Sequence, residues 1–177
     1  MSIQPRVSLL RWLDDCAFGY IGYQILVDGV IDGERREFWI GIDEATAQGR
    51  RLQFGDSLKG KCELATPSEF VEFSEVAILR VLARVARIGC KAPPWHGVPP
   101  PLTTYEERGC RRLTLRAYDD KCQSCIWGAV MLAEMILDRR KPLHRKYRDE
   151  TYCHGPPTCH LYHRGRSRRV TGKKGKI

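Results

Sequence analysis

Four cysteines in two short pairs form the clearest chemical pattern of the 177-residue chain. Cys122 and Cys125 have C-x2-C spacing within KCQSCIWG, and Cys153 and Cys159 have C-x5-C spacing within YCHGPPTCHLYH. Two thiolates three positions apart can bind one metal ion from a tight turn, and a second pair completes a tetrahedron. We therefore predict that these four cysteines form one metal site.

The predicted metal is a structural Zn²⁺ ion, for which four thiolates are a common ligand set. A [4Fe-4S] cluster also uses four thiolates and tolerates irregular spacing, so it is the alternative cofactor. Disulfides would need an oxidising compartment, and the absence of a signal peptide argues against one. A thioredoxin-like redox pair at Cys122 and Cys125 would leave Cys153 and Cys159 unexplained.

Other residues could join this ligand set. His154, His160 and His163 lie beside the second pair, and one of them could replace a thiolate. For His160 and His163 we favour a solvated or phosphate-contacting role. Cys110 lies twelve residues before Cys122 and is a further candidate. The remaining cysteines are expected to be ordinary buried thiols: Cys16, Cys62 and Cys90.

A hairpin is expected to bring the two cysteine pairs together. Residues 129–138 form an apolar arm, 139–146 a polar turn that contains proline, and 147–152 a return strand. The sequence therefore places a four-cysteine metal-binding module at 110–163.

The first 90 residues are expected to form mainly strands. The segments 20–29, 36–43 and 57–64 are short, rich in β-branched and aromatic residues, and separated by turns. For 66–89 a capping box at Thr66 and Glu69 favours a helix, whereas the β-branched and aromatic content favours strands. We predict strands there.

A small OB-like β-barrel is the architecture predicted for residues 1–90. The stretch FGDSLKGKCEL (54–64) resembles the segment that opens a strand in OB-type barrels. A turn at Gly55 and Asp56 would lead into a strand that Gly60 lets bend sharply. The predicted fold class is mainly β, with α+β as the alternative.

A proline-rich strap at 91–109 is expected to separate this barrel from the cysteine module. It holds five of the ten prolines of the chain, so the sequence predicts an extended segment without helix. The predicted units are thus 1–90, the strap, 110–163 and a basic tail at 164–177.

The positive charge belongs to the second half of the chain. Residues 1–90 carry a net charge of −2, and residues 91–177 carry +11. The tail adds seven cations and no acid, which suits phosphate contacts: Arg164, Arg166, Arg168, Arg169, Lys173, Lys174 and Lys176. We predict binding to RNA or single-stranded DNA in the cytoplasm, without a membrane partner. The alternatives are an iron–sulfur protein for electron transfer or sensing and a zinc-stabilised adaptor for a protein partner.

Catalysis finds little support in the sequence. There is no Gly-rich phosphate loop of Walker or Rossmann type, no G-x-S-x-G and no H-E-x-x-H. No catalytic residue is therefore assigned.

One resemblance covers most of residues 93–175. The succession PPWHGVPPPLTTYEERGCRRL, CQSCIWG, YRDETYCHGPPTC and RRVTGKKG resembles a family of uncharacterised prokaryotic cysteine-containing proteins. The resemblance implies that the strap, the four cysteines and the tail belong to one unit. It brings no catalytic assignment and identifies neither the metal nor the partner.

Overall fold

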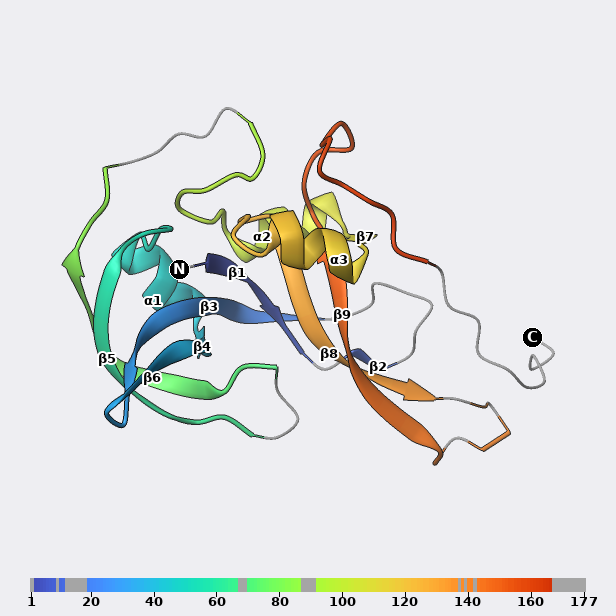
Figure 1. Ribbon diagram of the computed structural model, residues 1–177, viewed down its shortest axis with the longest axis horizontal. Helices are drawn as coiled ribbons and strands as arrows, with labels where there is room; N and C mark the ends of the chain where they lie inside the picture. Colours follow the sequence, from blue (N-terminus) through green and yellow to red (C-terminus); the bar gives the residue numbers. More distant parts are fainter. Residues whose placement is uncertain are drawn as a thin grey trace.

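Two β-sheets lie side by side in the computed structural model (Figure 1). The strand order is β1-β3-β4-β6-β5 in the first sheet and β2-β8-β9-β7 in the second. The prediction of a mainly β fold is therefore confirmed. The structure describes residues 2–8, 10–11, 19–66, 70–86, 92–136, 138, 140–141 and 143–166.

The first sheet contains the strands that the sequence predicts. Its members are β1 (Ser2–Val7), β3 (Tyr20–Ile31), β4 (Glu34–Ile42), β5 (Ser57–Leu64) and β6 (Phe73–Ala83). Strand β6 confirms the preference for a strand over a helix within 66–89. The sheet is mixed, because β4 and β6 run parallel while the other neighbours are antiparallel.

The predicted OB-like barrel does not form, because this sheet is not closed. Strands β1 and β5 are its two edges. The pairing of β5 with β6 shifts register between Lys59 and Lys61, the two residues that flank Gly60. The glycine thus lies at an irregularity of the strand pair rather than at a barrel-closing bend. The far end of β5 also lacks a cover, since Leu64 is 81% exposed.

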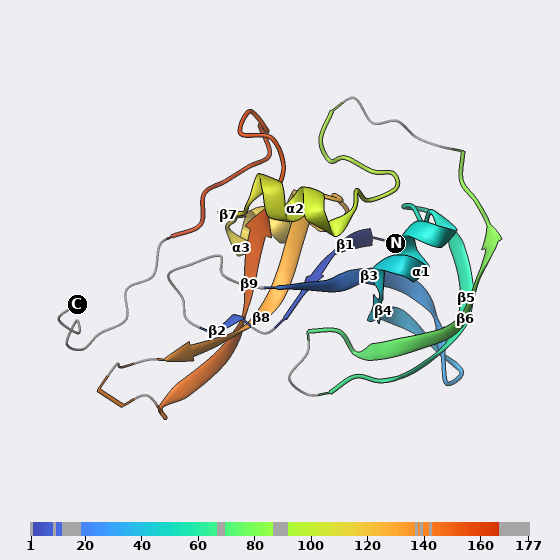
Figure 2. The same ribbon diagram turned by 180° about the vertical axis from the view of Figure 1, so that it is seen from behind.

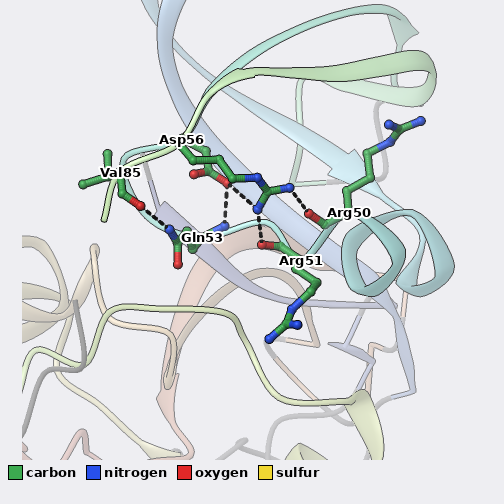
Figure 3. A network of polar contacts seen from close by, with 6 residues as sticks. Arg50, Arg51, Gln53, Asp56 and Val85 are labelled. Atoms are coloured by element: carbon green, nitrogen blue, oxygen red, sulfur yellow. Dashed lines mark hydrogen bonds and ion pairs between the residues drawn. The ribbon is translucent and has the colours of Figure 1, made fainter. Parts of the chain in front are cut away.

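The turn predicted at Gly55 and Asp56 is confirmed, and Asp56 organises it. Gly55 has a φ of 89°, and the buried Asp56 carboxylate accepts a hydrogen bond from the Gln53 N–H at 3.2 Å. Arg84 approaches the same carboxylate at 3.9 Å. Arg84 also donates to the carbonyl oxygens that end the helix α1 (Glu44–Arg50), those of Arg50 and Arg51 (Figure 3). This network ties the end of α1 to the end of β6.

The strap is extended only in its first part. Its expected lack of helix is wrong for 102–108, which form α2 (Leu102–Arg108). Pro101 stands immediately before the helix with a φ of −53°, a position where proline is tolerated because the first N–H groups have no helical partner. Residues 102–108 contain no proline, so the helix can continue.

The extended part of the strap crosses from one sheet to the other. The Tyr23 hydroxyl donates to the Pro100 carbonyl at 2.5 Å, and the Gln48 amide donates to the Pro99 carbonyl at 3.2 Å. At the other side, the Ile126 N–H donates to the Trp95 carbonyl at 2.9 Å. The strap is therefore fixed to both sheets.

The second sheet is built on a long hairpin. Its members are β2 (Leu10–Arg11), β7 (Arg111–Arg112), β8 (Gly128–Ile136) and β9 (Arg145–Cys153). Strands β8 and β9 confirm the predicted apolar arm and return strand. In Figures 1 and 2, α2 and the short helix α3 (Leu115–Ala117) lie at the end opposite the hairpin tip. That end carries both cysteine pairs.

Two buried glutamines join the sheets. The Gln24 amide of β3 donates to the Val130 carbonyl of β8 at 2.9 Å. Gln4 of β1 donates to the turn after the π-helical segment η1 (Tyr118–Cys122). In addition, β2 pairs with β8, so the N-terminal segment contributes a strand to each sheet. The division into separate units stays a prediction.

Candidate functional site

The first cysteine pair lies in a turn that the N-terminal strand holds. The Cys125 N–H donates to the Cys122 carbonyl at 3.0 Å, which closes the turn. The amide of Gln4 then donates to three of its carbonyl oxygens, those of Cys122, Gln123 and Cys125, at 3.1, 2.9 and 3.2 Å. The Ser2 hydroxyl also donates to the Gln123 carbonyl. Hydrogen bonds from β1 thus hold the turn in its shape.

Gly128 allows this close packing. A Cβ at this position would lie 2.6 Å from the Cys122 oxygen and 2.7 Å from Nε2 of Gln4. The sequence indicates that a glycine here relieves crowding near the sulfur atoms. In the structure the crowding comes from a carbonyl and from the Gln4 side chain, so any larger residue would push β1 off the turn.

The second pair begins where β9 ends. In the register of β8 and β9, Cys153 lies opposite Gly128, the first residue of β8. Gly128 follows Cys125 by three positions, so Cys153 lies close to the first pair. Beyond it the chain turns, and the Cys159 N–H donates to the Pro156 carbonyl at 3.1 Å. The hairpin thus returns the second pair to the first, as the sequence predicts.

All four thiols lie within electrostatic reach of one another. The pKa of the Cys122 thiol is raised to about 12, mainly by burial and further by Cys125, Cys153 and Cys159. Burial also raises the pKa of Cys125 to about 11, with contributions from Cys153 and Cys159. The pKa of Cys153 is raised by burial and by Cys159. Each thiol therefore opposes the ionisation of its neighbours.

Hydrogen-bond donors point at two of these sulfur atoms. Main-chain hydrogen bonds from Trp127 and Trp95 act on Cys125 and lower its pKa against the effect of burial. The Gly155 N–H donates to Sγ of Cys153 at 3.3 Å, and Arg111 approaches the same atom at 3.8 Å. N–H groups aimed at sulfur favour the thiolate form, which is the form that binds metal.

The cluster is not yet a metal site in its geometry. Within the described residues, no group of three or more His, Cys, Asp or Glu side chains is arranged to hold an ion. The donor set itself fits a thiophilic metal: four neighbouring thiols, three of them buried, with N–H donors on two. Such a set fits Zn²⁺ or an iron–sulfur cluster and does not fit Mg²⁺ or Ca²⁺, which take oxygen ligands.

His154 faces away from the cysteines. Its Nδ1 donates to the Gly109 carbonyl at 2.8 Å, and its ring packs edge-on against Tyr105, with centroids 5.2 Å apart. Burial lowers its pKa to about 4, so the ring is neutral. His154 is therefore a core residue in this arrangement, while His160 and His163 are exposed, as expected.

The other cysteines divide into three cases. Cys62 is a free thiol, as predicted, but it is half-buried rather than buried. Cys110 is disulfide-bonded, which removes it from the candidate ligands. Cys16 and Cys90 lie outside the described residues. Because disulfides are rare in a reducing cytoplasm, the bond at Cys110 gives no support to the predicted location, which stays a prediction.

The structure describes only the start of the predicted basic tail. Arg164 and Arg166 are exposed, and the other predicted phosphate contacts lie outside the described residues: Arg168, Arg169, Lys173, Lys174 and Lys176. Arg164 forms a β-bridge with Leu113, and the Gly165 N–H donates to the Arg112 carbonyl at 3.0 Å. The first tail residues thus belong to the folded module.

Arg111 and Arg112 in β7 have no role predicted from the sequence, yet both belong to the strand that pairs with the end of β9, where Cys153 lies. Arg111 contacts Cys153, and Arg112 pairs with Glu150 at 3.8 Å. The sequence did contain a signal, because in RGCRRL two arginines follow a cysteine directly. What it lacked was the pairing of β7 with the end of β9, which only the fold supplies.

Three partly buried aromatic side chains, those of Tyr20, Trp39 and Phe54, have ring partners within the protein. Tyr20 stacks on Tyr105 with centroids 6.2 Å apart, and Phe54 stacks on His96 at 4.3 Å. Trp39 makes an edge contact with Phe70. These three side chains therefore pack against other rings of the protein.

In the described part of the chain, no helix has the length and apolar character needed to cross a membrane. Comparison with protein-family models, with curated proteins and with solved structures finds no match for this chain. The resemblance over 93–175 therefore stays a prediction.

Proposed function

We propose that the protein binds RNA or single-stranded DNA through a basic surface that a structural Zn²⁺ ion supports. The observation that carries this proposal is the exposure of cations that flank the cysteine pairs along the chain. Lys121 precedes Cys122, and Arg164 and Arg166 follow Cys159. Further exposed cations lie near and on the hairpin: Arg140, Lys141, Lys146 and Arg148. Phosphate backbones bind such surfaces through direct ion pairs and counterion release.

The proposed ion site consists of Cys122, Cys125, Cys153 and Cys159. A thiol with a pKa near 11 or 12 is protonated at neutral pH, so these cysteines need a cation to ionise together. Zn²⁺ would supply that charge and draw the two turns into one tetrahedron. The ion would thereby fix the end of the second sheet from which the arginines of β7 and the tail project.

The alternative cofactor is an iron–sulfur cluster, which would make the protein an electron carrier or a sensor. The N–H groups directed at Cys125 and Cys153 favour this reading as well, because hydrogen bonds to sulfur tune cluster potentials. Anaerobic purification with metal analysis and a visible spectrum separates the two. A colourless protein with one zinc per chain supports the proposal, and a brown protein with iron and sulfide supports the alternative.

Binding is tested with fluorescent single-stranded RNA and DNA over a range of salt concentrations. We expect affinity to fall as salt rises, with a log–log slope of about −0.7 for each phosphate contact. A chain ending at Arg166 tests the tail. It removes 167–177 but keeps the contacts of Arg164 and Gly165, so the folded module is unchanged. Its slope should be shallower by several contacts.

The outcome that would remove nucleic acid from first place is a full-length, metal-loaded protein without measurable affinity at low salt. If that protein contained zinc, the remaining function would be that of an adaptor, in which the ion only shapes a surface for a protein partner.

A further inference from the structure

A cavity of about 430 Å³ opens beside the cysteine cluster, and cations dominate its lining. The residues around it are Arg111, Arg112, Tyr162, Arg164 and Gly165. They come from β7 and from the last described residues of the chain. Three guanidinium groups around one cavity repel one another unless an anion lies between them.

Arg111 is fixed in place by its surroundings. Its Nη2 donates to the carbonyl oxygens of Gly155 and Pro156 at 2.8 and 3.0 Å. Its guanidinium also lies over the Tyr162 ring, 4.2 Å from the centroid. The cation–π contact and the two carbonyls hold the charge at the wall of the cavity without neutralising it.

Arg112 is only partly satisfied. Its side chain is 16% exposed, and its Nη1 is buried without a hydrogen-bond partner among the described residues. The nearest acid is Glu150, at 3.8 Å, which already accepts a hydrogen bond from Arg148 at 2.7 Å. The Glu150 carboxylate therefore serves two guanidinium groups, those of Arg112 and Arg148. The two groups lie close enough that burial and the charge of Arg112 lower the pKa of Arg148.

Arg164 is placed at the cavity by the main chain. It forms a β-bridge with Leu113, and Gly165 donates to the Arg112 carbonyl. A Cβ on Gly165 would lie 2.7 Å from the Leu113 oxygen, so only glycine allows this approach. Main-chain contacts therefore fix the cavity on both sides, at Arg111 and at Arg164.

We propose that this cavity binds one phosphate group. A tetrahedral phosphate has oxygen atoms for more than one guanidinium, and arginine forks bind phosphate through paired hydrogen bonds. Arg112, which lines the cavity, and the exposed Arg164 supply the donors, with Arg111 as a fixed charge behind them. The assignment of this phosphate to a nucleic-acid strand rests on the proposed function. Binding of phosphate itself does not.

The phosphate site is tested with inorganic phosphate on the metal-loaded full chain. Arginine Nε–Hε signals are followed by NMR at low ionic strength, and the signals of Arg112 and Arg164 should shift with saturation. Arg164→Gln should weaken the affinity about tenfold, as expected for one charge-assisted contact. Arg35→Gln is the matched control with the same charge change, because Arg35 is exposed on the other sheet and pairs with Asp28. It should change the affinity less than about twofold.

A second variant, Arg112→Gln, tests the contribution of Arg112, with metal content and thermal unfolding measured alongside. The absence of saturable shifts in the wild-type protein, or equal affinity in Arg164→Gln and wild type, would overturn the phosphate site.

The source of the phosphate is tested with an RNA oligomer carrying either a 5′-hydroxyl or a 5′-phosphate. If a backbone phosphate occupies the site, Arg164→Gln should make the salt slope shallower by about 0.7 for both oligomers. A terminal phosphate would restrict the effect to the phosphorylated oligomer. A protein that binds phosphate without binding either strand would keep the site and overturn the proposed function instead. Strand binding with an unchanged slope would reject the site as a strand contact.

Discussion

The side-chain amide of Gln4 donates a hydrogen bond of 3.1 Å to the carbonyl oxygen of Cys122, which lies 118 positions further along the chain. The same amide reaches two more carbonyls of the cysteine turn, and its oxygen accepts a hydrogen bond from the Tyr118 hydroxyl at 2.7 Å. Gln4 is fully buried. The first strand of the chain therefore shapes the proposed ligand turn directly.

Gln4→Leu should destabilise the protein by about 1–3 kcal/mol, because it leaves buried carbonyl groups and the Tyr118 hydroxyl without partners. It should also weaken metal affinity, since the turn is no longer held in shape. Denaturant unfolding and competition with a colorimetric chelator measure the two effects. Gln48→Ala is the comparison, because Gln48 bonds Tyr23 and the strap away from the cysteines. An equal loss of metal affinity in both variants would contradict the role assigned to Gln4.

Single Cys→Ser changes at the four proposed ligands should each lower metal content and raise protease sensitivity of 110–165. The reason is that three ligands cannot complete the tetrahedron and leave buried thiols that resist ionisation together. Cys62→Ser is the control, because Cys62 is a free thiol in the other sheet. Unchanged metal content in all four variants would show that the site is wrong.

Chelation of the metal should reach further than the cysteine module. The sequence predicts that removal of the ion unfolds 110–165 and spares 16–90. Because Gln4 and Ser2 bond the ligand turn, we also expect faster amide exchange in β1 after chelation, measured by hydrogen exchange. Exchange in the β3–β4 pair should change less and serves as the internal reference.

Asp56→Ala should destabilise the first sheet by about 1–3 kcal/mol, since it leaves the Gln53 N–H and Arg84 without their buried acceptor. Asp120→Ala is the control, because Asp120 forms an exposed pair with Arg116 on a helical turn. That pair should contribute no more than about 0.5 kcal/mol. Thermal unfolding of both variants measures the difference, and equal effects would contradict the network in Figure 3.

Asp43 should give stability that depends on pH. Its carboxylate caps α1 by accepting hydrogen bonds from the Thr46 hydroxyl and N–H at 2.6 and 2.7 Å, which lowers its pKa. A pKa lowered by folding means that this stabilisation is complete above the ordinary aspartate pKa and is lost as the pH falls below it. Asp43→Ala should cost about 1 kcal/mol at neutral pH.

The pH dependence of this cap is checked with Asp43→Asn, which keeps an acceptor but does not titrate. The stability difference between Asp43→Ala and the wild type should shrink in acid, while that between Asp43→Ala and Asp43→Asn should not. A constant difference in both comparisons would assign the effect to packing instead.

The sequence predicted those elements whose signals are local. Alternating and β-branched residues identified β3, β4, β5 and the β8–β9 hairpin, and cysteine spacing identified two turns that do lie together. The barrel failed because closure is a relation between the edge strands β1 and β5, which no local pattern encodes. The helix α2 was missed because five prolines suggested extension beyond Pro101, where they end.

The supporting residues of the candidate site could not be found from local patterns. Gln4 lies 118 positions from Cys122, and Arg112 gains its place only through the pairing of β7 with β9. His154 shows that closeness in sequence can also mislead. It stands next to Cys153 in sequence, yet alternation along the strand end turns it toward Gly109 and away from the sulfur atoms.

The two short strands at the start of the chain have a consequence for synthesis on the ribosome. Strand β1 can pair with β3 as soon as residues 20–31 emerge, but the partners of Gln4 and of β2 lie at 118–134. Contacts this distant in sequence form late and slowly. Until the second half of the chain leaves the exit tunnel, the open edge at β1 and the buried face of Gln4 remain uncovered. The nascent chain should therefore be prone to aggregation during that interval.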